Sequence, residues 1–164
     1  MAPLQRESRL RQWLSLPVAI LICLAVSGLG AIATDAGTGS WYDGLQKAFW
    51  NPPAWVFAPV WTALYVTLGI ALWIIWKAPT SRGRSRALTL FFVQLGLNLA
   101  WSWIFFGLQM PLLALIDLVL LLGAIVATQR AAWWDTPFAS LIMLPYLGWC
   151  IFALTLNAAV VVLN

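Results

Sequence analysis

The side chains of this sequence that could do chemistry are indoles, amides and one acid inside an apolar stretch. Tryptophan occurs 12 times in 164 residues, and histidine does not occur. Without histidine the sequence lacks the most common general base and metal ligand, and with them the usual Ser-His and Cys-His nucleophile pairs. Stacking on indole rings and hydrogen bonding to amides remain, and both suit the binding of a flat, largely apolar molecule. We expect no cofactor and no metal.

Helical spacing places these aromatic and polar side chains on shared faces. The three faces are Gln94, Asn98, Trp101 and Phe105; Tyr146, Trp149, Ala153 and Asn157; and Trp61, Tyr65 and Leu68. An amide that faces lipid has unpaired donors and acceptors, so these faces should point inward. Two interpretations stay open: the amides tie helices together while the indoles fill space, or the faces line a pocket. The small residues Gly148 and Ala153 and the helix-disturbing Pro145 favour the pocket.

The elements that position these faces must cross a membrane. Apolar residues make up 63% of the chain and charged residues 9%, which excludes a soluble domain and argues against nucleic-acid binding. A crossing helix needs about 20 apolar residues. The predicted spans are 14–33, 54–76, 87–106, 112–128 and 138–163, with a turn at Gly107–Pro111 separating the third from the fourth. The predicted fold class is therefore an all-α membrane protein, a bundle of five transmembrane helices forming a single domain over residues 1–164.

Positive charges orient this bundle. One side carries Arg6, Arg9, Arg11, Lys77, Arg82, Arg84, Arg86 and Arg130, and the other carries Lys47. Since short loops rich in Lys and Arg stay cytoplasmic, the N-terminus is predicted inside and the C-terminus on the opposite side. An alternative for the first span is a signal peptide ending at Ala31–Ala33, although its apolar stretch is longer than is usual for one.

Several side chains have structural explanations. The interfacial aromatic belt accounts for Trp13, Trp73, Trp76, Trp133 and Trp134, but not for Trp61, Trp101, Trp103 and Trp149, which lie deeper in their spans. Cys23 and Cys150 are expected to be small buried hydrophobes. Asp117 is the one acid inside a predicted span, and we expect a hydrogen-bonded structural carboxyl rather than a proton carrier.

The connection 34–53 is long for a compact bundle and predicts a lid over the outer helix ends, or else an interfacial helix lying on the bilayer. Ser40 and Asp43 have the spacing of a capping box, which predicts a short helix with Trp41, Leu45, Ala48 and Phe49 on one apolar face. Lys47 is the single cation of this connection and could pair with a carboxylate of the ligand.

The order of several short motifs resembles the TspO/MBR family. These motifs are Trp41-Tyr42-Asp43, Trp50-Asn51-Pro52-Pro53, Pro59-Val60-Trp61, Gln94-Leu95 with Asn98 and Trp101, Phe105-Phe106-Gly107, Pro145-Tyr146-Leu147-Gly148-Trp149 and Leu156-Asn157. Together they cover about residues 16–158. The resemblance implies five transmembrane helices, usually a homodimer, and a pocket near the first loop for porphyrins such as protoporphyrin IX and for isoquinoline-carboxamide drugs. It also weighs against a cleaved first span.

The resemblance also implies roles for particular residues. Trp61 and Trp149 match two pocket tryptophans proposed to act in light-dependent porphyrin breakdown, and Asn98, Trp101, Ala153 and Asn157 match other pocket positions. The predicted ligand-binding residues are Trp41, Tyr42, Lys47, Trp50, Pro52, Trp61, Tyr65, Asn98, Trp101, Tyr146, Trp149, Ala153 and Asn157. The sterol-recognition motif of animal members is absent, because Ala158 and Val162 stand at its tyrosine and arginine positions.

The predicted function is an integral membrane receptor or carrier for porphyrins and related flat hydrophobic molecules. The first alternative is a porphyrin-degrading protein in which Trp61 and Trp149 are the catalytic residues. The second is a small proton-coupled drug exporter that uses Asp117. The expected partners are the ligand, membrane lipid and a second copy of the chain, and not nucleic acid.

Overall fold

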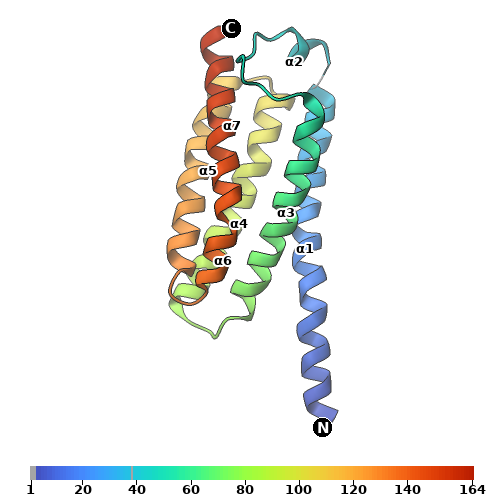
Figure 1. Cartoon of the computed structure of the whole chain (residues 1–164), viewed down its shortest axis with the longest axis vertical. Helices are drawn as coiled ribbons and strands as arrows, with labels where there is room; N and C mark the ends of the chain where they lie inside the picture. The colour runs from blue at the N-terminus through green and yellow to red at the C-terminus, as the bar shows by residue number, and fades with distance from the viewer. Residues whose placement is uncertain (1–2, 38) are drawn as a thin grey trace.

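The chain forms a bundle of long helices in a computed structural model that describes residues 3–37 and 39–164, with side chains for residues 15–37, 39 and 41–164 (Figure 1). All regular structure of these residues is helical, as predicted. The elements are α1 Pro3–Gly37, α2 Ser40–Gly44, α3 Ala54–Lys77, α4 Arg82–Ser102, the π-helix η1 Trp103–Gly107, α5 Pro111–Ala132, α6 Pro137–Ile142 and α7 Leu144–Leu163. Five stretches are long and apolar enough to cross a membrane: Ser15–Gly37, Ala54–Lys77, Arg82–Gly107, Pro111–Ala132 and Pro137–Leu163.

Local sequence signals set several helix ends. The Ser81 hydroxyl caps α4 by accepting a hydrogen bond from the Arg84 N–H at 2.8 Å. Proline begins both α5 and α6, where its missing N–H has no intrahelical partner to lose. The turn between η1 and α5 holds Gln109 at a positive φ of 56°. These signals explain why the predicted break between the third and fourth spans is found where it was expected.

The helices pack so that α3, α4 and α7 enclose the predicted functional faces. The most extensive contact joins α4 and α5, α1 packs against α3 and α4, and α7 packs against α5. Near the C-terminal end of α3, α6 packs closely on it, whereas α7 makes few close backbone contacts with α3. Side chains therefore bridge α3 and α7. Cys23 and Cys150 are free and buried, in agreement with the expectation that they serve as small hydrophobes.

Three local features differ in detail from the expectations. The first crossing helix continues to Gly37 rather than ending at residue 33, so the connection to α3 is shorter. The fifth span consists of α6 and α7, with the break at Met143 just before Pro145, which cannot donate an N–H to the preceding turn. The residue preceding α2 is Gly39, and α2 ends at Gly44 before Ala48 and Phe49. The predicted capping box involves the side chain of Ser40, which lies outside the described side chains.

The cations gather at one end of the bundle. The connections after α3 and after α5 lie at the end toward which the N-terminal part of α1 extends, and the C-terminus lies at the other end with α2 (Figure 1). The predicted cations Arg6, Arg9 and Arg11, together with Trp13, fall outside the described side chains. Trp76, Trp133 and Trp134 are exposed, as a belt requires.

Two tryptophans differ from their predicted surroundings. The Trp73 indole N–H donates to the Ser15 hydroxyl at 3.0 Å, so it joins α3 to α1 instead of serving the belt alone. Trp103, expected in a deep position, is 46% exposed. It stands two residues after the inward Trp101, which places it on the opposite side of the helix.

Candidate functional site

A hydrogen-bonded triad joins α3, α4 and α7 in the interior. The Tyr65 hydroxyl donates to Asn98 Oδ1 at 2.5 Å, and Asn98 Nδ2 donates to the Tyr146 hydroxyl at 3.0 Å. All three residues are buried. The predicted inward face is confirmed here, and the Asn98 amide ties helices together, as one of the two interpretations required.

An aromatic group lies next to this triad between α3 and α7. Trp61 meets Trp149 edge to face with ring centroids 6.4 Å apart, and it also approaches Tyr65 at 6.0 Å and Tyr146 at 6.5 Å. The spacing of these residues in the sequence predicted this convergence. The Trp149 indole Nε1 is buried and has no hydrogen-bond partner among the described residues. A donor of this kind is costly to leave unpaired in an apolar interior, so it is available to an acceptor on a ligand.

A second hydrogen-bonded pair joins α4, α5 and α7. The Trp101 indole N–H donates to Asn157 Oδ1 at 3.0 Å, and Asn157 Nδ2 donates to the Pro111 carbonyl at 2.8 Å. The Trp101 ring stacks on Phe105 at 5.4 Å. Ala153 is buried one helical turn before Asn157. Trp101 and Asn157 are therefore already paired with each other, and their predicted role in binding a ligand stays a prediction.

The connection between α1 and α3 closes over these helix ends. Trp41 and Tyr42 pack on Phe105 with centroids 5.6 and 6.3 Å away. The Lys47 ammonium lies 4.5 Å from the centre of the Tyr42 ring and makes no ion pair with a described acid. Burial raises the pKa of the Tyr42 phenol above its ordinary value, which keeps it neutral at physiological pH.

The same connection is fastened to the end of α7. The Gln46 N–H donates to Asn164 Oδ1 at 2.9 Å, and Asn164 Nδ2 donates back to the Gln46 carbonyl at 3.1 Å. The Trp50 indole N–H donates to the Thr155 hydroxyl at 3.4 Å. Within the connection itself, Asn51 Nδ2 donates to the half-buried Pro52 carbonyl at 3.0 Å. The bonds to α7 are exposed, so water can replace them, as the predicted lid requires.

A surface hollow of about 410 Å³ lies between this lid and the ends of α5 and α7. Its lining residues are Trp41, Leu45, Gln109, Pro111, Leu112, Val160, Val161 and Asn164. Of the predicted ligand-binding residues only Trp41 lines it. Trp61 and Trp149 contact each other instead of bordering this hollow, so a planar molecule would have to part their rings.

Two polar side chains in the core have buried atoms without a hydrogen-bond partner among the described residues. Gln94 is fully buried, and neither its Oε1 nor its Nε2 has a hydrogen-bond partner in the described part of the chain. Asp117 is also buried, and its Oδ2 has no partner among the same residues. The expectation of a fully hydrogen-bonded carboxyl at Asp117 is therefore not met.

The sequence reasoning missed two residues of the aromatic group. Phe57 and Phe152 contact the Trp149 ring with centroids 6.0 and 5.4 Å away. Phe57 stands one helical turn before Trp61, so the spacing rule that grouped Trp61 with Tyr65 could have found it. Phe152 stands three residues after Trp149, the same interval that separates Tyr146 from Trp149, so the spacing rule could have found it as well.

Comparison with known proteins agrees with the resemblance drawn from the motifs. The TspO/MBR family model matches residues 19–163. The chain is similar to the tryptophan-rich protein TspO of Archaeoglobus fulgidus, with 44% identity over 151 residues that cover 92% of this chain and 97% of the relative. It is similar to the human translocator protein, with 43% identity over 122 residues, 73% of this chain and 72% of the relative. The tryptophan-rich sensory protein of Cereibacter sphaeroides is 33% identical over 147 residues, covering 86% of this chain and 91% of that protein.

Proposed function

This chain belongs to the TspO/MBR family of multi-pass membrane proteins, and from that premise we propose that it binds porphyrins and related flat hydrophobic molecules between α3 and α7, beneath the lid. One observation supports this most strongly: Trp61 and Trp149 meet at 6.4 Å next to an indole N–H that has no partner among the described residues. Ring faces stack on a planar macrocycle, and the free donor suits a polar substituent.

The lid provides a way for the ligand to enter this site. Binding opens the weak bonds of the lid to α7, parts the two indole rings and inserts the ligand between them. The Lys47 ammonium, which makes no ion pair with a described acid, then pairs with a propionate at the mouth of the site. The Tyr65–Asn98–Tyr146 triad forms the floor, because its polar atoms are already paired and need not be desolvated again.

Titration of the detergent-purified protein with protoporphyrin IX, followed by the porphyrin absorbance band, tests this proposal. We expect saturable binding and a Kd raised about fivefold by Trp149→Phe, because phenylalanine keeps a ring face but removes the indole N–H, whose hydrogen bond contributes about 1 kcal/mol. Trp134→Phe is the matched control, since Trp134 is 88% exposed at the opposite end, and its Kd should stay within about twofold. Non-saturable binding, or equal Kd values for the two variants, would contradict the proposal.

A second candidate function is light-dependent breakdown of the bound porphyrin. The paired indoles of Trp61 and Trp149 favour it, since an excited porphyrin held between them could take an electron from an indole. Illumination in air should bleach porphyrin faster with the wild type than with Trp61→Phe/Trp149→Phe. The two bleaching rates are compared at protein concentrations that bind all of the porphyrin, so that a weaker affinity of the variant does not change the result. Equal bleaching rates would leave binding as the function and eliminate the photochemical role.

We also propose that the N-terminus faces the cytoplasm and that the protein is a homodimer. The gathering of Lys77, Arg82, Arg84, Arg86 and Arg130 at one end supports the orientation, because such residues are retained on the cytoplasmic side.

A further inference from the structure

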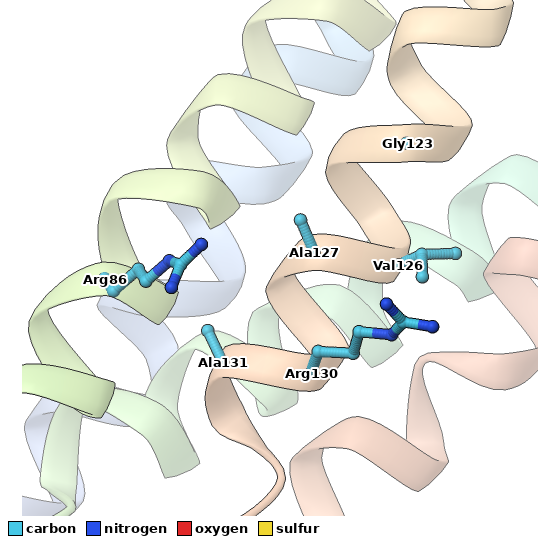
Figure 2. Close-up of a pocket in the computed structure, with 6 residues that line it drawn as sticks. All are labelled: Arg86, Gly123, Val126, Ala127, Arg130 and Ala131. Carbon is cyan, nitrogen blue, oxygen red and sulfur yellow. The ribbon is translucent and has the colours of Figure 1, made fainter.

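A hollow of about 360 Å³ lies between α4 and α5, near the end of the bundle opposite the lid. Its lining residues are Arg86 of α4 and Gly123, Val126, Ala127, Arg130 and Ala131 of α5 (Figure 2). Arg86 reaches from α4 toward the side of α5 that carries Ala127 and Ala131, and Arg130 extends from α5 beside Val126 (Figure 2). The two cations come from the neighbouring helices α4 and α5, which share the most extensive contact of the bundle.

The two guanidinium groups at this hollow have no partner among the described residues. Neither Arg86 nor Arg130 makes a hydrogen bond or an ion pair there, and both are exposed. Other cations at this end are engaged: Arg84 donates twice to the Trp76 carbonyl, at 3.1 and 2.8 Å, and the Lys77 ammonium lies 4.3 Å from the centre of the Trp73 ring. The nearby Asp135 carboxylate accepts from the Ser81 hydroxyl. Both guanidinium groups are therefore available to donate hydrogen bonds to a negatively charged ligand at the hollow.

The rest of the hollow is apolar and lined by small residues. Gly123, Ala127 and Ala131 recur at intervals of four and share one face of α5, and a side chain added at Gly123 would meet nothing within 4 Å. This face runs from the last turn of α5, where Arg130 lies, toward the middle of the span. The hollow thus combines a cationic end with a groove that can take a hydrocarbon chain.

We propose that this hollow binds an anionic phospholipid, with its phosphate on Arg86 and Arg130 and one acyl chain along Gly123, Ala127 and Ala131. Guanidinium groups bind phosphate oxygens in a bidentate manner, and basic pockets at the ends of membrane helices recognise acidic headgroups. Free phosphate would leave the apolar groove uncovered. If a second copy of the chain packed symmetrically on this face, Arg86 and Arg130 of one copy would approach the same two arginines of the other. Repulsion between these like charges disfavours that arrangement.

Native mass spectrometry of the full-length protein in detergent, titrated with phosphatidylglycerol or phosphatidylcholine, tests this inference. We expect phosphatidylglycerol to bind about 25-fold more tightly than phosphatidylcholine, from about fivefold for each arginine. Arg86→Gln/Arg130→Gln should remove that preference. Arg82→Gln is the matched control, because Arg82 is a cation of the same end that does not line the hollow, and the preference should persist in it.

Two further variants separate charge from shape. Arg86→Lys/Arg130→Lys keeps the charge and should retain part of the preference for phosphatidylglycerol. Gly123→Leu fills the groove, so it should weaken the binding of phosphatidylglycerol and leave the binding of inorganic phosphate unchanged. The inference is overturned if Arg86→Gln/Arg130→Gln keeps the preference or if Arg82→Gln loses it equally. It is also overturned if inorganic phosphate competes as well as the lipid, or if the variants change dimerisation and not lipid binding. Porphyrin binding of every folded variant should match the wild type, because the hollow lies at the opposite end from the lid.

Discussion

Replacing Asn98 by leucine is expected to destabilise the bundle by about 2–4 kcal/mol, because it leaves two buried phenols without the partner that now joins them. A single hydrogen bond between membrane helices averages only about 0.6 kcal/mol. The larger value is expected here because Asn98 serves α3 and α7 at once, and because leucine offers neither a donor nor an acceptor to Tyr65 and Tyr146. Unfolding in mixtures of detergent and SDS, followed by tryptophan fluorescence, measures the change.

A triple variant makes this prediction specific. Tyr65→Phe/Asn98→Leu/Tyr146→Phe removes every polar atom of the triad, so it should be more stable than Asn98→Leu alone despite carrying more substitutions. Thr62→Val is the control, since the Thr62 hydroxyl donates only to the Ala58 carbonyl of its own helix, at 2.8 Å. If Asn98→Leu unfolds like the control, or if the triple variant is the least stable of all, the triad does not hold the helices together.

Placing a methyl group at Gly69 is expected to separate α1 from α3. A Cβ built at Gly69 would lie 2.5 Å from the Cα of Ile20, and a backbone atom cannot move aside without moving the helix. Overpacking of this kind costs about 1–3 kcal/mol. The crossing segment of α1 is the least buried of the five, so few other contacts of α1 can compensate for the loss of packing at Gly69.

Gly28→Ala supplies the matched control for Gly69→Ala. Gly28 lies in α1, and a Cβ there would meet nothing within 4 Å, so alanine should stabilise the helix by up to about 1 kcal/mol. Because both variants replace a helical glycine by alanine, this gain cancels, and their free energies of unfolding should differ by the overpacking cost of about 1–3 kcal/mol. Equal stabilities would mean that α1 docks on α3 differently from the arrangement described here.

The spans and their faces could be predicted because both depend on local rules. Span length follows from the thickness of the membrane, and the period of the helix fixes which residues share a face. That is why Gln94 and Asn98 are inward and why Trp61 and Trp149 converge. The turn residues at Gly107–Pro111 predicted the break between two spans for the same reason, since glycine and proline act on their immediate neighbours.

The lid was predicted only in part. Its length and composition indicated a cover, and its bonds to α7 agree with that role. The predicted extent of α2 was wrong, because the helix ends at Gly44, and Ala48 and Phe49 lie beyond its end. Phe49 is almost fully exposed, so the expected apolar face does not exist.

The sequence by itself determined that this is a five-span membrane protein of the TspO/MBR family and which side chains face inward, since membrane thickness and helical period act along the chain. Only the tertiary structure decided that Asn98 and Asn157 are occupied in holding helices together, that the Trp149 indole N–H has no partner in the described part of the chain, and that Arg86 and Arg130 line one hollow. The physical reason is that a hydrogen bond or a shared cavity depends on the separation and relative rotation of two helices to within about 1 Å. That geometry arises from the packing of the whole bundle and is not encoded in the spacing of any one segment.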